Sequence, residues 1–66
     1  MIPPKKRKEM GIIIRKAREA KKMTQPILAS KLGQPYVLIG RLERGDFAAL
    51  NQAMMDKLCE ILEIEL

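Results

Sequence analysis

The stretch Met23–Gly45, MTQPILASKLGQPYVLIGRLERG, decides the fold because it holds two short helix patterns separated by one tight turn. Thr24 is a good N-cap, and Pro26 falls in the following first turn, where a missing backbone N–H costs little. Gly33 supplies the left-handed residue that commonly ends a helix. The pattern therefore predicts a helix over 25–32. Its inward face consists of Leu28, Ala29 and Leu32.

A second helix is predicted over about 35–44, after a turn that consists only of Gly33 and Gln34, and Gly45 ends it. Residues at i, i+3, i+4 and i+7 share one side of a helix, which we expect to face the core. They are Pro35, Leu38, Ile39 and Leu42. The opposite side carries Tyr36, Val37, Gly40, Arg41 and Arg44. Two short helices joined by a glycine turn in a small basic chain indicate a helix-turn-helix.

Further helices are predicted on both sides of this unit. Glu9–Lys22 has a helical apolar stripe, and so does Gln52–Leu62 after a loop over 46–51. The two stripes consist of Met10, Ile13, Ile14 and Ala17, and of Met55, Leu58, Cys59 and Leu62. The last four residues, EIEL, fit a short strand or the start of a further element equally well. We expect an all-α, four-helix domain over 9–66 that follows a basic disordered tail over 1–8.

Composition limits the classes of protein that this chain can represent. Its 66 residues suffice for one small domain, and its only aromatic residues are Tyr36 and Phe47. The single cysteine excludes an internal disulfide, which favours a reducing, intracellular setting. No apolar run has membrane-spanning length, and the N-terminus lacks a secretory hydrophobic region. We expect a cytoplasmic protein without a membrane partner.

Charge is distributed unevenly along the chain. Residues 1–23 carry nine Lys/Arg against two Glu, whereas residues 46–66 carry one Lys against five Asp/Glu. A basic front and an acidic end indicate a polyanion partner on the basic side. The alternative is a distribution that serves solubility alone.

The quoted stretch resembles the helix-turn-helix of the phage-repressor/Cro (XRE) family. Upstream, IIRKAREAKKMTQ resembles the first helix of that family, and downstream MMDKLCEIL resembles the fourth, so that the resemblance covers about residues 10–62. It implies a repressor-like fold, double-stranded DNA as the partner, and a prokaryotic or phage origin. The positions that carry it are Arg18, Thr24, Gln25, Leu28, Ala29, Leu32, Gly33, Ile39, Leu42, Glu43, Arg44 and Gly45.

The resemblance also implies roles for individual residues. Gln25 matches a glutamine that binds a DNA phosphate and braces the recognition helix. Arg18 and Glu43 match a structural ion pair between the first and third helices. One branch of the family has G-P-Q-S at the turn, so Tyr36 and Val37 replace polar residues that hydrogen-bond to bases.

The outward side of the third helix is therefore expected to read DNA with few polar groups. Arg41 can donate to guanine O6 and N7, Val37 can contact a thymine methyl, and Gly40 can let the backbone approach closely. Tyr36 adds a hydroxyl on an apolar ring, and Arg44 is expected on a phosphate. Alternatively, the two apolar side chains serve packing or a protein contact, and the arginines form an ordinary solvated face.

Phosphate contacts are also expected from the basic residues that precede the helix-turn-helix. They are Lys5, Lys6, Arg7, Lys8 and Arg15. The run of four in the tail has three other interpretations, an arm in a neighbouring minor groove, a solvated disordered segment and a short nuclear-import signal.

The leading hypothesis is a DNA-binding transcriptional regulator, a repressor, that binds a two-fold operator as a homodimer with its third helix in the major groove. The alternative is a protein-interaction module on the same fold, an antitoxin component or bridging factor, whose exposed Tyr36 and Val37 contact a toxin or the transcription machinery. We do not expect an enzyme, a cofactor or a metal, because the chain has no histidine and no zinc or phosphate-loop spacing. The operator sequence, the sign of regulation and the dimer surface stay open.

Overall fold

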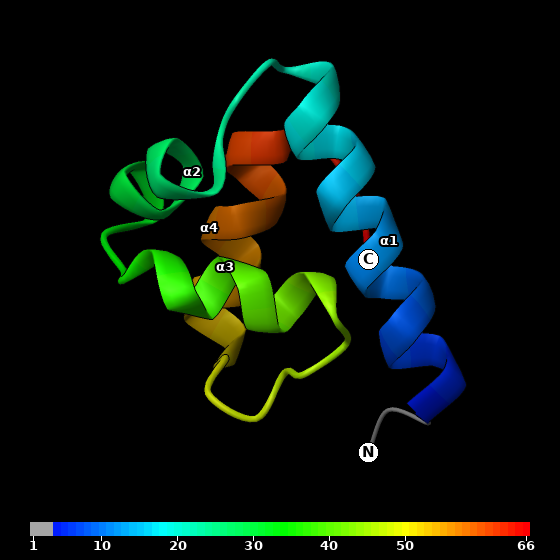
Figure 1. The fold of residues 1–66 in the computed structure, drawn as a ribbon. Helices are drawn as coiled ribbons and strands as arrows, with labels where there is room; N and C mark the ends of the chain where they lie inside the picture. The colour runs from blue at the N-terminus through cyan, green and yellow to red at the C-terminus, as the bar shows by residue number, and fades with distance from the viewer. Residues whose placement is uncertain (1–3) are drawn as a thin grey trace.

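A computed structural model describes residues 4–66 and confirms the all-α expectation (Figure 1). The helices of this range are α1 (Pro4–Ala20), α2 (Gln25–Leu32), α3 (Tyr36–Glu43) and α4 (Gln52–Leu62). In Figure 1, α3 lies in front of α4, α2 lies beside the start of α3, and α1 runs along the other side. The helix-turn-helix therefore packs against both α1 and α4.

One apolar core joins the four helices. Aliphatic side chains fill it, as expected for a chain so poor in aromatic residues. The buried apolar residues are Met10, Ile14, Leu28, Ala29, Leu32, Leu38, Ile39, Leu42, Leu58 and Leu62. This list confirms the inward faces expected for α2 and, with the exception of Pro35, for α3.

Hydrogen bonds at the helix ends explain where the elements begin and stop. The hydroxyl of Thr24 accepts from the N–H of Ile27 at 3.2 Å, as its position before α2 predicts. Asn51 caps α4 in the same way, accepting from the N–H of Met54 at 2.8 Å. Gly33 has φ +74° after α2, in the left-handed region that glycine enters without strain.

The beginning of α1 differs from the expectation. The sequence predicts a tail over residues 1–8 before a helix at Glu9, but α1 begins at Pro4 and includes Lys5–Lys8. Proline is favourable at the first position of a helix, and Lys and Arg are good helix formers, so local sequence permits this start. Met1–Pro3, the rest of that expected tail, lie outside the described residues.

Two residues that the helical spacing placed inward are exposed. Ile13 is 43 % exposed, because α1 buries only the narrow stripe around Met10 and Ile14. Pro35 precedes α3 as its N-cap residue and is exposed as well. The helical period does not hold for a residue that stands before the helix.

The last four residues form neither a strand nor a helix. Glu63 ends α4 in the left-handed region at φ 57°, and the N–H of Ile64 donates to the carbonyl of Cys59 at 3.0 Å. The side chain of Ile64 packs against the core. Lys21 donates to Glu63 at 2.7 Å, and this bond lowers the pKa of the Glu63 carboxyl below its usual value. The chain end is thereby tied to the end of α1.

Helix α1 passes very close to the backbone at the end of α3. A Cβ built at Gly11 would lie 2.6 Å from the carbonyl oxygen of Leu42 and 2.7 Å from that of Glu43. Only glycine fits at such distances. Gly11 therefore sets the separation between α1 and the C-terminal end of α3.

Candidate nucleic-acid interface

The outward side of α3 is exposed, whereas its inward side is buried. The side chains of Tyr36 and Val37 are 58 % and 51 % exposed, and Arg41 is exposed one turn later. Leu38, Ile39 and Leu42 anchor the helix on the other side. The apolar residues of α3 thus form two sets. Leu38, Ile39 and Leu42 pack into the core, whereas Tyr36 and Val37 are exposed.

Gly40 is not among the exposed residues of α3. It is buried, and a Cβ built on it would lie 3.5 Å from a guanidinium nitrogen of Arg44 and 3.7 Å from the amide oxygen of Gln25. Gly40 is thus on the outward side, as expected, but the Arg44 and Gln25 side chains cover it. Gly40 leaves room for these side chains above the backbone.

A part-buried ion pair fixes α3 to the rest of the fold. Arg18 donates through Nε and a second guanidinium nitrogen to the two Glu43 carboxylate oxygens, at 2.6 Å and 3.1 Å. Its remaining nitrogen donates to the carbonyl of Met23 at 2.7 Å. The two side chains are only 11 % and 6 % exposed. The hydrogen bond to Glu43 raises the pKa of Arg18 above its usual value, so the guanidinium stays charged.

Gln25 joins this network from the first position of α2. Its side-chain amide donates to a carboxylate oxygen of Glu43 at 3.2 Å, and the side chain is half-buried. The N-terminal end of a helix attracts anions, because its first N–H groups point outward with the positive end of the dipole. The bracing that the resemblance implied is thus present, with Glu43 as the contact in α3.

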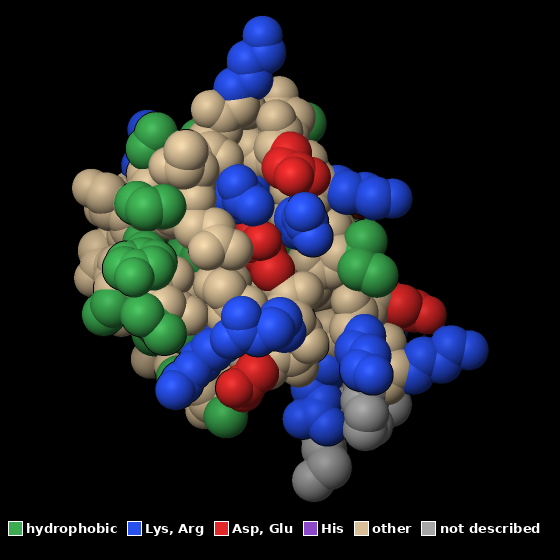
Figure 2. Space-filling view, in the orientation of Figure 1, with side chains coloured by type: hydrophobic (Ala, Val, Ile, Leu, Met, Phe, Trp, Pro, Cys, Tyr) green, Lys and Arg blue, Asp and Glu red, His purple; other side chains and the backbone are tan. Residues whose placement is uncertain are grey.

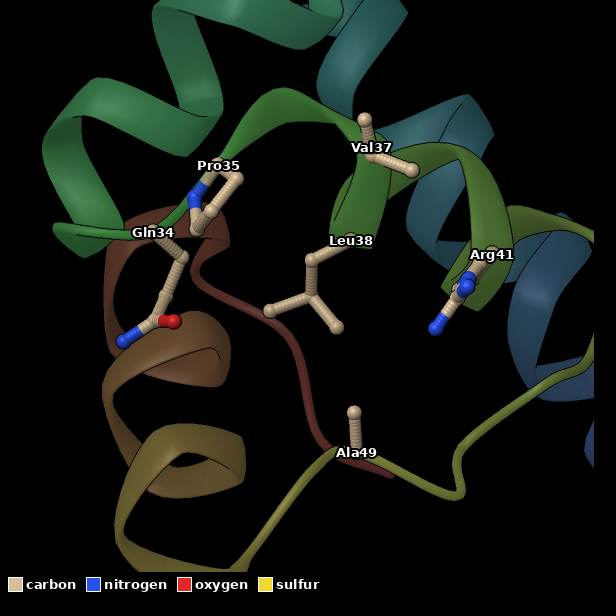
Figure 3. A pocket seen from close by; sticks show the side chains of 6 residues that line it. All are labelled: Gln34, Pro35, Val37, Leu38, Arg41 and Ala49. Atoms are coloured by element: carbon tan, nitrogen blue, oxygen red, sulfur yellow. The ribbon is translucent and has the colours of Figure 1, made fainter.

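A shallow hollow of about 290 Å³ lies beside the exposed side of α3 (Figure 3). In Figure 3, Leu38 points into it from α3, Ala49 faces it from the loop before α4, and Arg41 stands at one end. The wall is apolar apart from Arg41 and Gln34. Gln34, Pro35, Val37, Leu38, Arg41 and Ala49 line it.

Basic side chains gather on the same face of the molecule. Figure 2 shows Lys and Arg over α1 and α3, and hydrophobic side chains over α2 and the start of α3. The basic residues for which the sequence predicts DNA contacts belong to α1, to α3 and to the position directly after α3. Lys5, Lys6, Lys8, Arg15, Arg41 and Arg44 are exposed, and Arg7 is half-buried. Arg15 also pairs with Glu19 at 3.5 Å, both side chains being more than half exposed.

Cys59 lies away from this face. It is half-buried on α4, and desolvation by burial raises the pKa of its thiol. A raised pKa lowers the thiolate fraction and therefore the reactivity. This agrees with the interpretation of Cys59 as a small core residue.

A family model described as Helix-turn-helix matches residues 14–66. The chain belongs to the XRE-type helix-turn-helix family. This family consists of DNA-binding regulators rather than enzymes, so the exposed side of α3 in this helix-turn-helix protein is its candidate nucleic-acid interface. No curated protein and no solved structure matches the chain significantly. Within residues 4–66, no helix is both long and apolar enough to cross a membrane.

Sequence reasoning misses two positions that shape this interface. Gly11 and Gly45 lie where α1 meets the end of α3, and the helical pattern alone predicts no such contact for either. An isolated glycine inside the helical pattern around Gly11 is an available signal, because it often marks a close packing contact. Gly45 is predicted only to end α3, which its φ of +90° agrees with.

Proposed function

We propose that this helix-turn-helix protein is a transcriptional repressor that binds a two-fold operator as a homodimer, with α3 in the major groove. The observation that carries the proposal is the exposed side of α3, which projects Tyr36, Val37 and Arg41 from a helix anchored on its other side. A major groove about 12 Å wide admits one α-helix. Arg44 and Gln25 flank this surface and suit phosphates.

Base reading is assigned chiefly to Arg41 and the hollow beside it. A guanidinium can donate two hydrogen bonds to guanine O6 and N7. The apolar wall at Val37 fits a thymine methyl, and Tyr36 adds a hydroxyl at the start of α3. With Gly40 covered, no base contact is assigned to it.

Repression requires only occupancy of a promoter, since a bound protein excludes polymerase from the same DNA. A single α3 presents few base-reading groups, and a homodimer on a two-fold site doubles them. The basic residues of α1, including Arg15, add salt-dependent affinity through phosphates. We place this activity in the cytoplasm of a prokaryote or in a phage-infected cell.

The exposed apolar side chains support a second candidate function, a protein-interaction module. Ile27 is 46 % exposed, and Tyr36 and Val37 are more exposed still. Such a surface suits a toxin or a component of the transcription machinery. Under this alternative, Tyr36→Ala with Val37→Ser abolishes co-purification of one stoichiometric protein partner, and DNA affinity stays unmeasurable at low salt.

Arg41→Ala should raise the Kd for the operator about 5- to 150-fold per half-site and relax the preference at one base pair, since a bidentate contact contributes about 1–3 kcal/mol. Site selection from a random DNA pool gives the operator, and fluorescence anisotropy gives the Kd. Lys31→Ala is the control, because it removes the same charge at a different place. Lys31 lies on α2 and lines a separate hollow with Lys21, Met23 and Ile61, to which α3 contributes no residue. Equal losses in the two variants would contradict base reading by Arg41. Failure of the wild type to bind any duplex at low salt would refute the proposed function.

A further inference from the structure

The first turns of α1 extend beyond the part of the chain that the family match covers. The match begins at residue 14, whereas α1 begins at Pro4. We call residues 4–13 the N-terminal extension. At 1.5 Å per residue it is about 15 Å long. In Figure 1 it projects past the end of α3.

Two glycines fix the N-terminal extension against the end of α3. A Cβ built at Gly45 would lie 3.2 Å from the backbone nitrogen and the Cα of Lys8. At Gly11, as described above, a Cβ would overlap the last carbonyl oxygens of α3. The contact is therefore between backbones, and it determines where the extension points relative to the recognition helix.

The N-terminal extension is strongly cationic where it projects. Residues 5–8 are all Lys or Arg, and only Glu9 offsets them before Arg15. Lys5, Lys6 and Lys8 are exposed. The carbonyl end of α3 attracts a nearby cation, but one lysine satisfies that attraction. The other charges have no acidic partner among the ion pairs of residues 4–66, which leaves them available to an external polyanion.

We propose that the N-terminal extension is a rigid DNA-backbone-binding element, which contacts phosphates flanking the base pairs read by α3, on the side where α3 ends. This inference rests on the proposed function. Its length corresponds to about four base pairs at 3.4 Å each. Gly11 and Gly45 are its positioning residues. Each half-site thus includes flanking base pairs whose sequence is not read but whose phosphates contribute to affinity.

The charge contribution is tested with the combined variant Lys5→Ala, Lys6→Ala, Lys8→Ala on the selected operator. A plot of log K against log salt should become shallower by about 0.9 for each phosphate that the variant no longer neutralises, that is by about 1 to 3 for each half-site. The preference for the base pair that Arg41 reads should be unchanged. An unchanged slope together with Arg41-dependent specificity would refute phosphate binding by the N-terminal extension but would leave the proposed function standing. No binding by the wild type would overturn both.

Rigidity is tested with Glu9→Pro against Glu9→Ala, which change the charge equally. Proline at residue 9 removes the bond to the residue 5 carbonyl and breaks the helix there, while the four basic residues stay in the chain. The proline variant should bind the operator more weakly and with a shallower salt slope than the alanine variant. Thermal unfolding of both variants checks that the rest of the domain remains folded. Equal binding would show that residues 4–8 act as a flexible tail, and would overturn the proposal.

Trimming the duplex provides a measurement on the unmodified protein. Removing the flanking base pairs on the side where α3 ends should weaken binding by the wild type, and should leave binding by the lysine-to-alanine variant unaffected. If trimming weakens both proteins alike, the flank is not contacted by the extension, which contradicts the proposal.

Discussion

Arg18→Ala should lower the free energy of unfolding by about 3 kcal/mol, because it leaves the Glu43 carboxylate buried without its cation. The substitution removes two charge-assisted bonds to Glu43 and one bond to the carbonyl of Met23. Domains of about this size are marginal, with total stabilities near the lower end of about 5–15 kcal/mol. We therefore expect the variant to keep only about 2 kcal/mol of stability, so that its urea midpoint falls by more than half in urea denaturation followed by circular dichroism.

Arg15→Ala is the matched control for that experiment. It lies on the same helix and pairs with Glu19, but the two side chains are 64 % and 53 % exposed. Exposed pairs at i, i+4 contribute about 0.3–0.5 kcal/mol, so this variant should unfold almost like the wild type. A decrease of similar size in both variants would mean that the effect comes from helix α1 itself rather than from the buried pair.

The two central helices could be predicted from sequence because their determinants are local. Thr24 and Gly33 each act within one turn of a helix end, and the structure has both as expected. The burial of Leu28, Ile39 and Leu42 follows from helical period alone. Local rules also placed Pro35 on the inward face, and they failed there because the helix begins one residue later.

Features that the sequence did not predict depended mostly on contacts between distant segments. Gly11 and Gly40 both lie inside helices, but one meets backbone carbonyls and the other lies beneath flexible side chains. Gly11 meets residues of another helix, which no local pattern predicts, whereas Arg44, which helps to cover Gly40, lies about one turn further along the chain. The helical start at Pro4 has the same origin, because Lys8 lies against Gly45, which is remote in sequence.

The candidate site was predictable in part. The exposure of Tyr36, Val37 and Arg41 follows from their phase on the helix, and the structure agrees. The pairing of Arg18 with Glu43 came from family resemblance, since two residues so far apart leave no local signal. Contacts with bases and phosphates involve a second molecule, and they stay predictions until DNA binding is measured.

Gly11→Ala should destabilise the domain by about 1–3 kcal/mol, because the new methyl group would overlap two carbonyl oxygens of α3. Those oxygens belong to backbone, so relief requires α1 and α3 to separate. For a domain of about 60–100 residues, about 1 kcal/mol corresponds to about 4–8 °C in Tm. Alanine is the better helix former by about 0.5–1 kcal/mol, and the expected destabilisation is what remains after that gain.

Gly40→Ala separates the packing effect from helix propensity. A Cβ at Gly40 would be 3.5 Å or more from its neighbours, which are the ends of the Arg44 and Gln25 side chains. This variant should therefore be as stable as the wild type or slightly more stable, with a Tm that is unchanged or higher. Calorimetry should show a clear decrease in Tm for Gly11→Ala and no decrease for Gly40→Ala. If Gly11→Ala also stabilises, α1 does not approach the end of α3 closely, and the N-terminal extension lacks the contact that would hold it in place.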